Sequence, residues 1–291
     1  MRELLVIADK EGKKQSAFFH ALELARNTGA DIEFVGFTHA AGVDSSDILT
    51  HDQKREIHHK YIERKQAEMN EFLAGVDTGG VKIKTDVVWE KSIDRWVIAR
   101  CDQKSFDMVF KSGNRTESFL YTPTDWQLMR YCPEPVMIVG DSPWKEGGKI
   151  LAALDLGNDS QKVMQLNELV MRQSIKLSKA SNSEVHVCYV MPIPKALRDL
   201  DLVDLNEYEQ KLRARLDPVI ARMFDDAGLP RERLHLVSGK PHKEICKLVD
   251  KLEADVVVIG NKTGTSLRGR LMGNTAENVL HEVKADVVVV K

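Results

Sequence analysis

The sequence predicts two α/β domains in tandem, each a doubly wound, open sheet of five parallel strands covered by helices. Three observations support this fold class: the length of the chain, segments that recur in one order, and apolar strands that alternate with amphipathic helices. With 291 residues, the chain has the length of two domains, since one usually takes ~100–200 residues. Alternating strands and helices are typical of parallel sheets with helices on both faces.

The recurring segments form an internal repeat. Four segments of the first half return in the second half in the same order. They are residues 3–9 with 149–155, 21–37 with 174–190, 106–113 with 254–261, and 132–139 with 283–290. One such match can arise by chance, but four in a fixed order indicate duplication. Residues 141–148 contain proline and glycine between two apolar strands, as a short linker would, which predicts domains at 1–141 and 149–291.

The strands and helices of the second half follow from its apolar periodicity. Strands are expected at residues 150–155, 184–190, 234–237, 255–260 and 286–290. Most are rich in Val and Ile without polar alternation, as strands buried on both faces are. Apolar helical stripes are formed by Leu212, Leu216, Ile220, Met223 and Phe224, and by Ile245, Leu248, Val249 and Leu252. Pro218 is expected to kink or interrupt the first of these helices.

Composition excludes several classes of protein. The charges balance at 42 Lys+Arg against 44 Asp+Glu, which argues against a nucleic-acid or anionic-membrane partner. No apolar run approaches the ~20 residues of a membrane span, and the N-terminus does not resemble a signal peptide. The cysteines lack metal or redox spacing and are read as small apolar residues: Cys101, Cys132, Cys188 and Cys246. A soluble protein of the cytoplasm is expected.

A ligand site is expected where doubly wound sheets bind ligands, outside the carboxyl ends of the strands where the strand order reverses. In the second half, Asp155 ends the first strand and Gly260 ends the fourth. A loop with several glycines then leads to a helix near Asn274, whose first N–H groups and positive dipole end suit an anion. Asn274 and Glu277 have the spacing of a capping box. The same glycines also fit ordinary turns, so the spacing alone leaves both readings open.

The arrangement resembles the universal stress protein family over essentially the whole chain, twice over. Nucleotide-binding members carry G-x2-G-x9-G-(S/T) after the fourth strand and an aspartate after the first. Gly260 and Gly273 match the first and third glycines, and Asp155 matches the aspartate. Thr263 stands where the second glycine is expected, and Asn274 stands at the final Ser/Thr.

The resemblance implies a site in the second domain for ATP or another adenine nucleotide, with magnesium as a candidate companion. Its expected residues are Asp155, Val190, Val237, Gly260, Lys262, Gly264, Gly273, Asn274 and Thr275. The resemblance also implies that the two halves pair through their last strands. Homo-oligomers and protein partners are further expectations.

The first half has the same order of strands and helices around the corresponding place, but it lacks the groups that would bind a phosphate. Asp9 ends its first strand, but Pro123 takes the place of Asn274 and has no N–H to offer a phosphate. Asp125 adds negative charge and Trp126 adds bulk near the same place. The first half is therefore expected to be a structural or partner-binding domain.

Different roles are expected for the histidines. His51, His58 and His59 are expected on a solvated helix face rather than in a metal site. His186 is expected to be paired on its strand. His242 follows the third strand and is a candidate to reach the cleft.

The preferred hypothesis is a cytoplasmic stress-response sensor or scaffold, in which nucleotide occupancy orders the loop from Gly260 to Gly273. A first alternative is an interaction protein without a nucleotide, whose clefts are vestigial or hold an apolar metabolite. A second is a slow ATPase that draws on Lys262, Arg268 and His242. There is no Walker loop and no kinase signature, so efficient catalysis is not expected.

Overall fold

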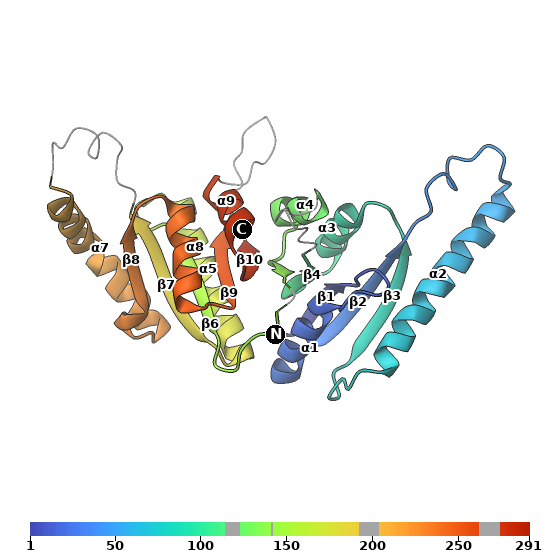
Figure 1. The fold of residues 1–291 in the computed structure, drawn as a ribbon, viewed down its shortest axis with the longest axis horizontal. Helices are drawn as coiled ribbons and strands as arrows, with labels where there is room; N and C mark the ends of the chain where they lie inside the picture. The colour runs from blue at the N-terminus through green and yellow to red at the C-terminus, as the bar shows by residue number, and fades with distance from the viewer. Residues whose placement is uncertain (114–122, 141, 192–203, 262–273) are drawn as a thin grey trace. The chain divides into compact units, whose positions relative to one another are not determined.

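The computed structural model describes residues 1–113, 123–140, 142–191, 204–261 and 274–291. They form two compact units, the first ending at Pro143 and the second running from Trp144 to Lys291 (Figure 1). Strands and helices alternate along each unit, so the predicted fold class of two tandem open parallel sheets is confirmed.

Each unit contributes five strands. The first unit contains β1 (Glu3–Ile7), α1 (Ser16–Thr28), β2 (Asp31–Thr38), α2 (His51–Ala74), β3 (Ile83–Trp89), α3 (Ile93–Gln103), β4 (Met108–Ser112), α4 (Pro123–Tyr131) and β5 (Val136–Val139). The second contains β6 (Lys149–Leu154), α5 (Gln161–Ser181), β7 (Glu184–Met191), α7 (Leu205–Ala227), η1 (Arg231–Arg233), β8 (Leu234–Ser238), α8 (Pro241–Leu252), β9 (Val256–Gly260), α9 (Asn274–Glu282) and β10 (Asp286–Val290). The strands predicted in the second half are present, each within one residue of its expected ends.

The two sheets have the same strand order, β3-β2-β1-β4-β5 in the first unit and β8-β7-β6-β9-β10 in the second. In the first unit, Val6 pairs with Phe34 on one side and Phe110 on the other. In the second, Ala152 pairs with Val187 and Val258. Right-handed crossovers place α5 and α7 on one face of the second sheet, and α8 and α9, which pack together, on the other.

The cores are built where the apolar strands meet these helices. In the first unit, the Phe18 ring packs on Phe34 and Phe72, with ring centroids 4.7 Å and 5.2 Å apart. In the second unit, β9 and β10 are buried runs of Val and Ile. Burial of both faces explains why these strands lack polar alternation.

The helix that contains Pro218 is continuous. α7 runs from Leu205 to Ala227 with Pro218 inside it, so of the two expected effects the interruption is wrong, while a kink stays a prediction. Proline removes one backbone hydrogen bond, while the face formed by Leu216, Ile220 and Phe224 stays buried. Packing of this face holds the helix together across the proline.

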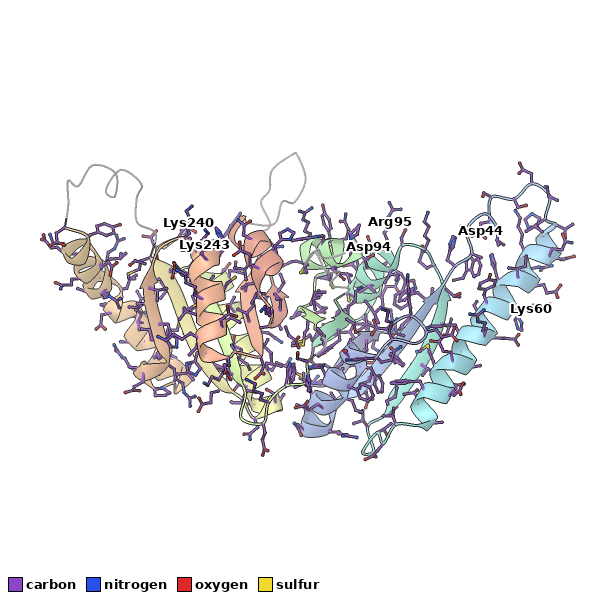
Figure 2. The ribbon with its side chains drawn as sticks, viewed as in Figure 1. Asp44, Lys60, Asp94, Arg95, Lys240 and Lys243 are labelled. Atoms are coloured by element: carbon purple, nitrogen blue, oxygen red, sulfur yellow. The ribbon has the colours of Figure 1, made fainter. Side chains whose placement is uncertain are left out.

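The histidines of α2 also differ in part from the prediction of a solvated face. His58 stacks on Trp89, with ring centroids 3.9 Å apart, and its Nε2 lies 2.7 Å from Asp44 Oδ1. Trp89 Nε1 donates to the other Asp44 oxygen at 3.1 Å, so the carboxylate ties the segment before α2 to β3 (Figure 2 labels Asp44). His59, by contrast, is exposed.

Titratable groups lie at matching places in the two sheets, buried in the first unit and half-buried in the second. In the first unit, the Glu33 side chain is 2% exposed and accepts hydrogen bonds from Arg100 Nε at 2.8 Å and Nη2 at 2.9 Å, and from Lys104 at 3.1 Å. In the second, His186 Nδ1 lies 3.0 Å from His235 Nε2, which agrees with the expected pairing of His186. Burial lowers the pKa of both histidines.

The cysteines are mostly buried, as expected for small apolar residues. Cys101, Cys132 and Cys188 are buried and Cys246 is half-buried. The sequence did not suggest that Cys101 and Cys132 meet, yet their Sγ atoms lie 3.7 Å apart. The contact with Cys132 and burial raise the pKa of Cys101, so its sulfur remains a neutral thiol.

Candidate functional site

The strand order of the second unit reverses between β6 and β9, which pair directly. The chain leaves β6 towards α5 on one face and reaches β9 from α8 on the other. The segments that follow the two strands therefore separate and leave a crevice at their carboxyl ends. Asp155 follows β6 at this crevice, and Gly260 is the last residue of β9.

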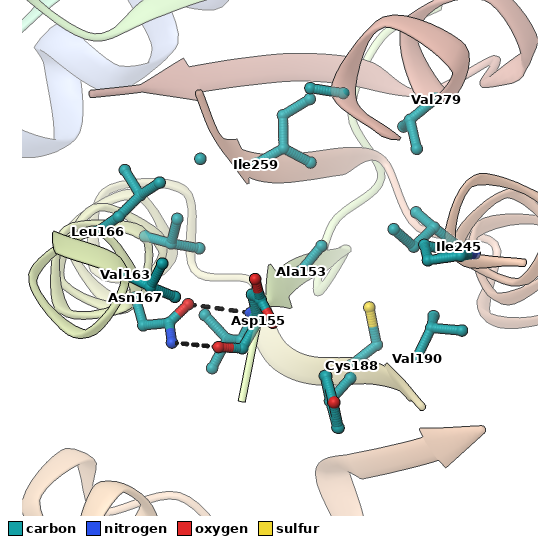
Figure 3. Close-up of a pocket in the computed structure, with 16 residues that line it drawn as sticks. Ala153, Asp155, Val163, Leu166, Asn167, Cys188, Val190, Ile245, Ile259 and Val279 are labelled. Atoms are coloured by element: carbon teal, nitrogen blue, oxygen red, sulfur yellow. Dashed lines mark hydrogen bonds between the residues drawn. The ribbon is translucent and has the colours of Figure 1, made fainter. Parts of the chain in front are cut away.

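A cavity of about 430 Å³ occupies this crevice (Figure 3). Its walls come from the ends of β6, β7 and β9 and from α5, α8 and α9. The lining residues are Ala153, Leu154, Asp155, Val163, Leu166, Asn167, Val170, Cys188, Tyr189, Val190, Pro241, Ile245, Ile259, Gly260, Ala276 and Val279. Most are aliphatic, and a small set of polar groups among apolar walls is the usual make-up of a small-molecule site.

Asn167 holds the backbone at the end of β6. The Asp155 N–H donates to Asn167 Oδ1 at 3.0 Å, and Asn167 Nδ2 donates to the Asp155 carbonyl at 2.9 Å (Figure 3). Asn167 is 8% exposed, and this pair of bonds satisfies its amide in an otherwise apolar place. Sequence reasoning missed Asn167, although an amide within the apolar face of α5 was an available signal.

Tyr189 is a second lining residue that the sequence did not single out. Burial, together with the nearby Asp155 carboxylate, raises the pKa of its hydroxyl, which therefore stays protonated as a hydrogen-bond donor. The hydroxyl packs closely against the loop after β6, since a Cβ on Gly157 would lie 2.2 Å from it. A side chain at position 157 would therefore displace the Tyr189 hydroxyl.

Gly260, at the end of β9, lies close to Leu166 of α5. A Cβ at Gly260 would lie 2.6 Å from Leu166 Cγ and 2.7 Å from Cδ2. A larger residue would push Leu166 away or narrow the cavity. The glycine expected from the motif thus has a packing reason in addition to any contact with a ligand.

The structure brings together three of the expected site residues. Asp155, Val190 and Gly260 line the cavity, whereas Val237 in β8 is not among the lining residues. Lys262, Gly264 and Gly273 lie outside the described residues, as do Thr263 and Arg268. Asn274 and Thr275 are the first residues of α9, and their side chains are also outside the description. From that helix, Ala276 and Val279 reach the cavity wall.

His242, the other candidate near the cleft, lies in the first turn of α8. Its neighbours Pro241 and Ile245 line the cavity, whereas His242 does not. Its Nε2 lies 3.9 Å from Glu282 Oε1 on α9. The geometry assigns it a contact between the two helices.

The matching place in the first unit is built differently. Ser112, in the position of Gly260, donates a hydrogen bond to Asp9 Oδ2 at 2.6 Å and accepts one from the Ala17 N–H at 3.0 Å. Gln15 brackets the Asp9 backbone, accepting from its N–H at 2.8 Å and donating to its carbonyl at 3.3 Å, much as Asn167 brackets Asp155. Side-chain groups of the first unit therefore meet one another where the second unit has a cavity.

No three or more His, Cys, Asp or Glu side chains in the described segments are arranged to hold a metal ion. Within the same segments, every helix is too short or too polar to span a bilayer.

Comparison with known proteins agrees with the fold and the repeat. The family model of the universal stress protein family matches residues 1–140 and again residues 148–291. Universal stress protein E of Escherichia coli (strain K12) is 28% identical over 296 residues, covering 100% of this chain and 94% of that protein. The universal stress protein E homolog of Haemophilus influenzae is 24% identical, covering 100% and 97%.

Solved structures extend the same similarity. The crystal structure of a putative universal stress protein from Pseudomonas aeruginosa UCBPP-PA14 has a TM-score of 0.77 at 25% identity, covering 100% of this chain and 93% of that one. A universal stress protein from Archaeoglobus fulgidus shares the fold alone, with a TM-score of 0.67 at 14% identity and coverage of 99% and 96%. Since the family model matches both halves, this chain belongs to the universal stress protein family, with two of its domains in tandem.

Proposed function

We propose that the chain is a cytoplasmic stress-response sensor or scaffold whose second unit binds an adenine nucleotide such as ATP. The observation that carries the proposal is the cavity of about 430 Å³ at the carboxyl ends of β6, β7 and β9. Its volume falls within the ~300–1,000 Å³ usual for small-ligand sites. Asp155, which follows β6, lines it together with Val190 of β7 and Gly260 of β9.

The chemistry of the walls suits the base and ribose of a nucleotide. Aliphatic side chains such as Val163 and Ile259 offer apolar surface to a flat ring, and Asp155 can accept hydrogen bonds from amino or hydroxyl groups. The phosphates are proposed to lie towards the start of α9, where backbone N–H groups and the helix dipole favour an anion. Lys240 and Lys243 are exposed at the start of α8, beside the lining residue Pro241, and add positive charge on that side (Figure 2).

The proposed role is binding rather than turnover. Among the described lining residues, Asp155 is the one carboxylate, and none is a lysine, arginine or histidine. Phosphoryl transfer needs cationic or metal groups that stabilise the developing charge and a group that orients the attacking nucleophile. A nucleotide bound in the cavity would instead hold α5, α8 and α9 against the strand ends. This would change how the second unit binds a protein partner.

The test is calorimetric titration of the purified, ligand-stripped chain with magnesium-ATP. One site per chain is expected. Asp155→Asn should weaken binding, since it removes the charge of the carboxylate in the cavity. Asp9→Asn is the matched control at the same position of the first unit, and it should leave affinity and stoichiometry unchanged. No saturable heat at two temperatures, or equal losses in both variants, would contradict the proposal.

A second candidate is an apolar metabolite in place of the nucleotide, in a protein that works through its partners. The mostly aliphatic lining favours it. The two candidates separate by competition: a bound hydrophobic dye such as anilinonaphthalene sulfonate would be displaced by a fatty or aromatic metabolite but not by magnesium-ATP. The remaining alternative, slow ATP hydrolysis, is tested by measuring phosphate release in the same samples. The rate of the wild type is compared with that of Asp155→Asn.

A further inference from the structure

Lys111 and Asp125 form a buried ion pair in the first unit. Lys111 Nζ lies 2.6 Å from Asp125 Oδ1, and the two side chains are 8% and 0% exposed. The Lys111 ammonium also donates to the Ser112 carbonyl at 3.0 Å. Lys111 lies near the carboxyl end of β4, and a buried lysine in an apolar strand is costly unless an anion pairs with it.

The positions of this pair are those of the cavity wall in the second unit. β4 pairs with β1 as β9 pairs with β6, since Leu4 lies opposite Met108 and Ile150 opposite Val256. Three residues further along each strand, Lys111 therefore corresponds to Ile259. Asp125 and Ala276 are each the third residue of a nine-residue helix that leads to the last strand.

Both counterparts, Ile259 and Ala276, line the cavity of the second unit. The first unit thus places a cation and an anion in contact at the two places where the second unit has an apolar wall. The anion stands in the first turn of α4, where a helix dipole stabilises negative charge. This is the location at which a helix start would receive the anionic group of a ligand.

We infer that the Asp125 carboxylate is a built-in anionic occupant of the first unit's cleft, and that Lys111 is its receptor. The pair supplies from within the chain the charge that an anionic ligand would bring. Ser112 completes the arrangement, because its hydroxyl engages the Asp9 carboxylate at 2.6 Å. The first unit therefore contains a latent anion site that its own side chain keeps filled, and it takes no external anion while Asp125 is in place.

The experiment removes the occupant and offers a small substitute. Asp125→Ala leaves the Lys111 ammonium facing a hole of carboxylate size. The melting temperature should fall by about 10 °C, the size expected when one partner of a buried pair is lost. Sodium formate should restore most of the loss in a saturable way, whereas sodium chloride at equal ionic strength should not. Formate should leave the wild-type melting temperature unchanged relative to chloride.

Two control variants test whether rescue by formate requires Lys111 and whether the loss of stability is specific to Asp125. Lys111→Met/Asp125→Ala lacks the receptor, so formate should give it no more stability than chloride does. Asp94→Ala, a half-buried carboxylate in the first turn of α3 (Figure 2), controls for losing a negative charge in the same unit. If Asp125→Ala does not fold, Asp125→Ser leaves a smaller hole and the same comparison applies.

Equal stabilisation by formate of the double variant, or a folded Asp125→Ala that formate does not rescue, would overturn the inference. The melting temperatures are measured without a nucleotide. The inference is therefore tested independently of the proposed function of the second unit.

Discussion

The buried network around Glu33 allows the sharpest test of how the first unit is stabilised. We consider Arg100→Met, which keeps most of the apolar stem of the side chain but removes the guanidinium. The change deletes the two hydrogen bonds to Glu33, at 2.8 Å and 2.9 Å, and leaves a carboxylate that is 2% exposed. Lys104 Nζ, at 3.1 Å, remains as its cationic partner.

The expected loss follows from these contacts. A hydrogen bond to a charged group contributes ~1.5–3 kcal/mol, and removing one partner of a buried pair costs ~3–5 kcal/mol. The Arg100 side chain is 24% exposed, so solvent screens part of its interaction, and Lys104 still compensates part of the Glu33 charge. We therefore expect Arg100→Met to lower the free energy of unfolding of the first unit by about 2–3 kcal/mol.

The assay is urea unfolding followed by tryptophan fluorescence. Three of the four tryptophans, Trp89, Trp96 and Trp126, lie in the first unit, and a Trp144→Phe background removes the signal of the fourth. The signal then reports on the first unit even if the two units unfold separately. Arg55→Met is the matched control, because Arg55 pairs with Asp52 on the surface of α2 with side chains 79% and 84% exposed. Such a pair contributes ~0–0.5 kcal/mol.

The pH dependence gives a second reading of the same network. Burial alone would raise the pKa of Glu33, but the hydrogen bonds from Arg100 and Lys104 outweigh it, and the pKa is lowered. Its stabilising contribution is therefore present above the unfolded-state pKa of ~4.3 and is lost as the pH falls through the folded-state pKa. The gap between wild type and Arg100→Met should narrow in acid. A loss equal to that of the Arg55 control, or a gap independent of pH, would refute the reasoning.

Three other predictions concern the second unit and the thiols. Burial lowers the pKa of His186 and His235, so both favour the neutral form in the folded state, and the melting temperature should drop as the pH falls below ~6.5. Replacing both with Gln should flatten that drop; an unchanged profile would exclude the pair as its source. Gly260→Val should cost ~1–3 kcal/mol in urea unfolding and reduce ligand binding, because its Cβ would lie 2.6 Å from Leu166 Cγ. Binding at wild-type strength would show that the cavity is not where the ligand lies. The last prediction is tested by maleimide labelling of the native chain followed by mass spectrometry. Cys246 should react first, because it is half-buried while the other three thiols are buried. Burial raises the pKa of Cys246 to about 11, which slows its reaction without reversing this order. Faster labelling of a buried thiol would indicate local opening.

The position of the cavity could be predicted in outline because it follows from the ends of strands. Asp155 and Gly260 end two apolar runs, and the topology of doubly wound sheets brings such ends together. Val237 shows the limit of this reasoning. It belongs to a strand of the same sheet, but β8 lies at the edge, separated from β9 by β6 and β7, and Val237 does not line the cavity. Asn167 and Tyr189 were not predicted as lining residues, because their roles depend on residues of other segments that pack against them.

The sequence by itself determined the fold class, the duplication and the positions of the strands. These features depend on local apolar periodicity and on a repeat that is visible without any contact between distant residues. Only the tertiary structure decided how the polar groups inside each unit are satisfied. Lys111 with Asp125, Glu33 with Arg100 and His186 with His235 each join different elements. A charge within an apolar strand is costly or stabilising according to the partner that folding places against it, and that partner is not encoded in the neighbouring residues.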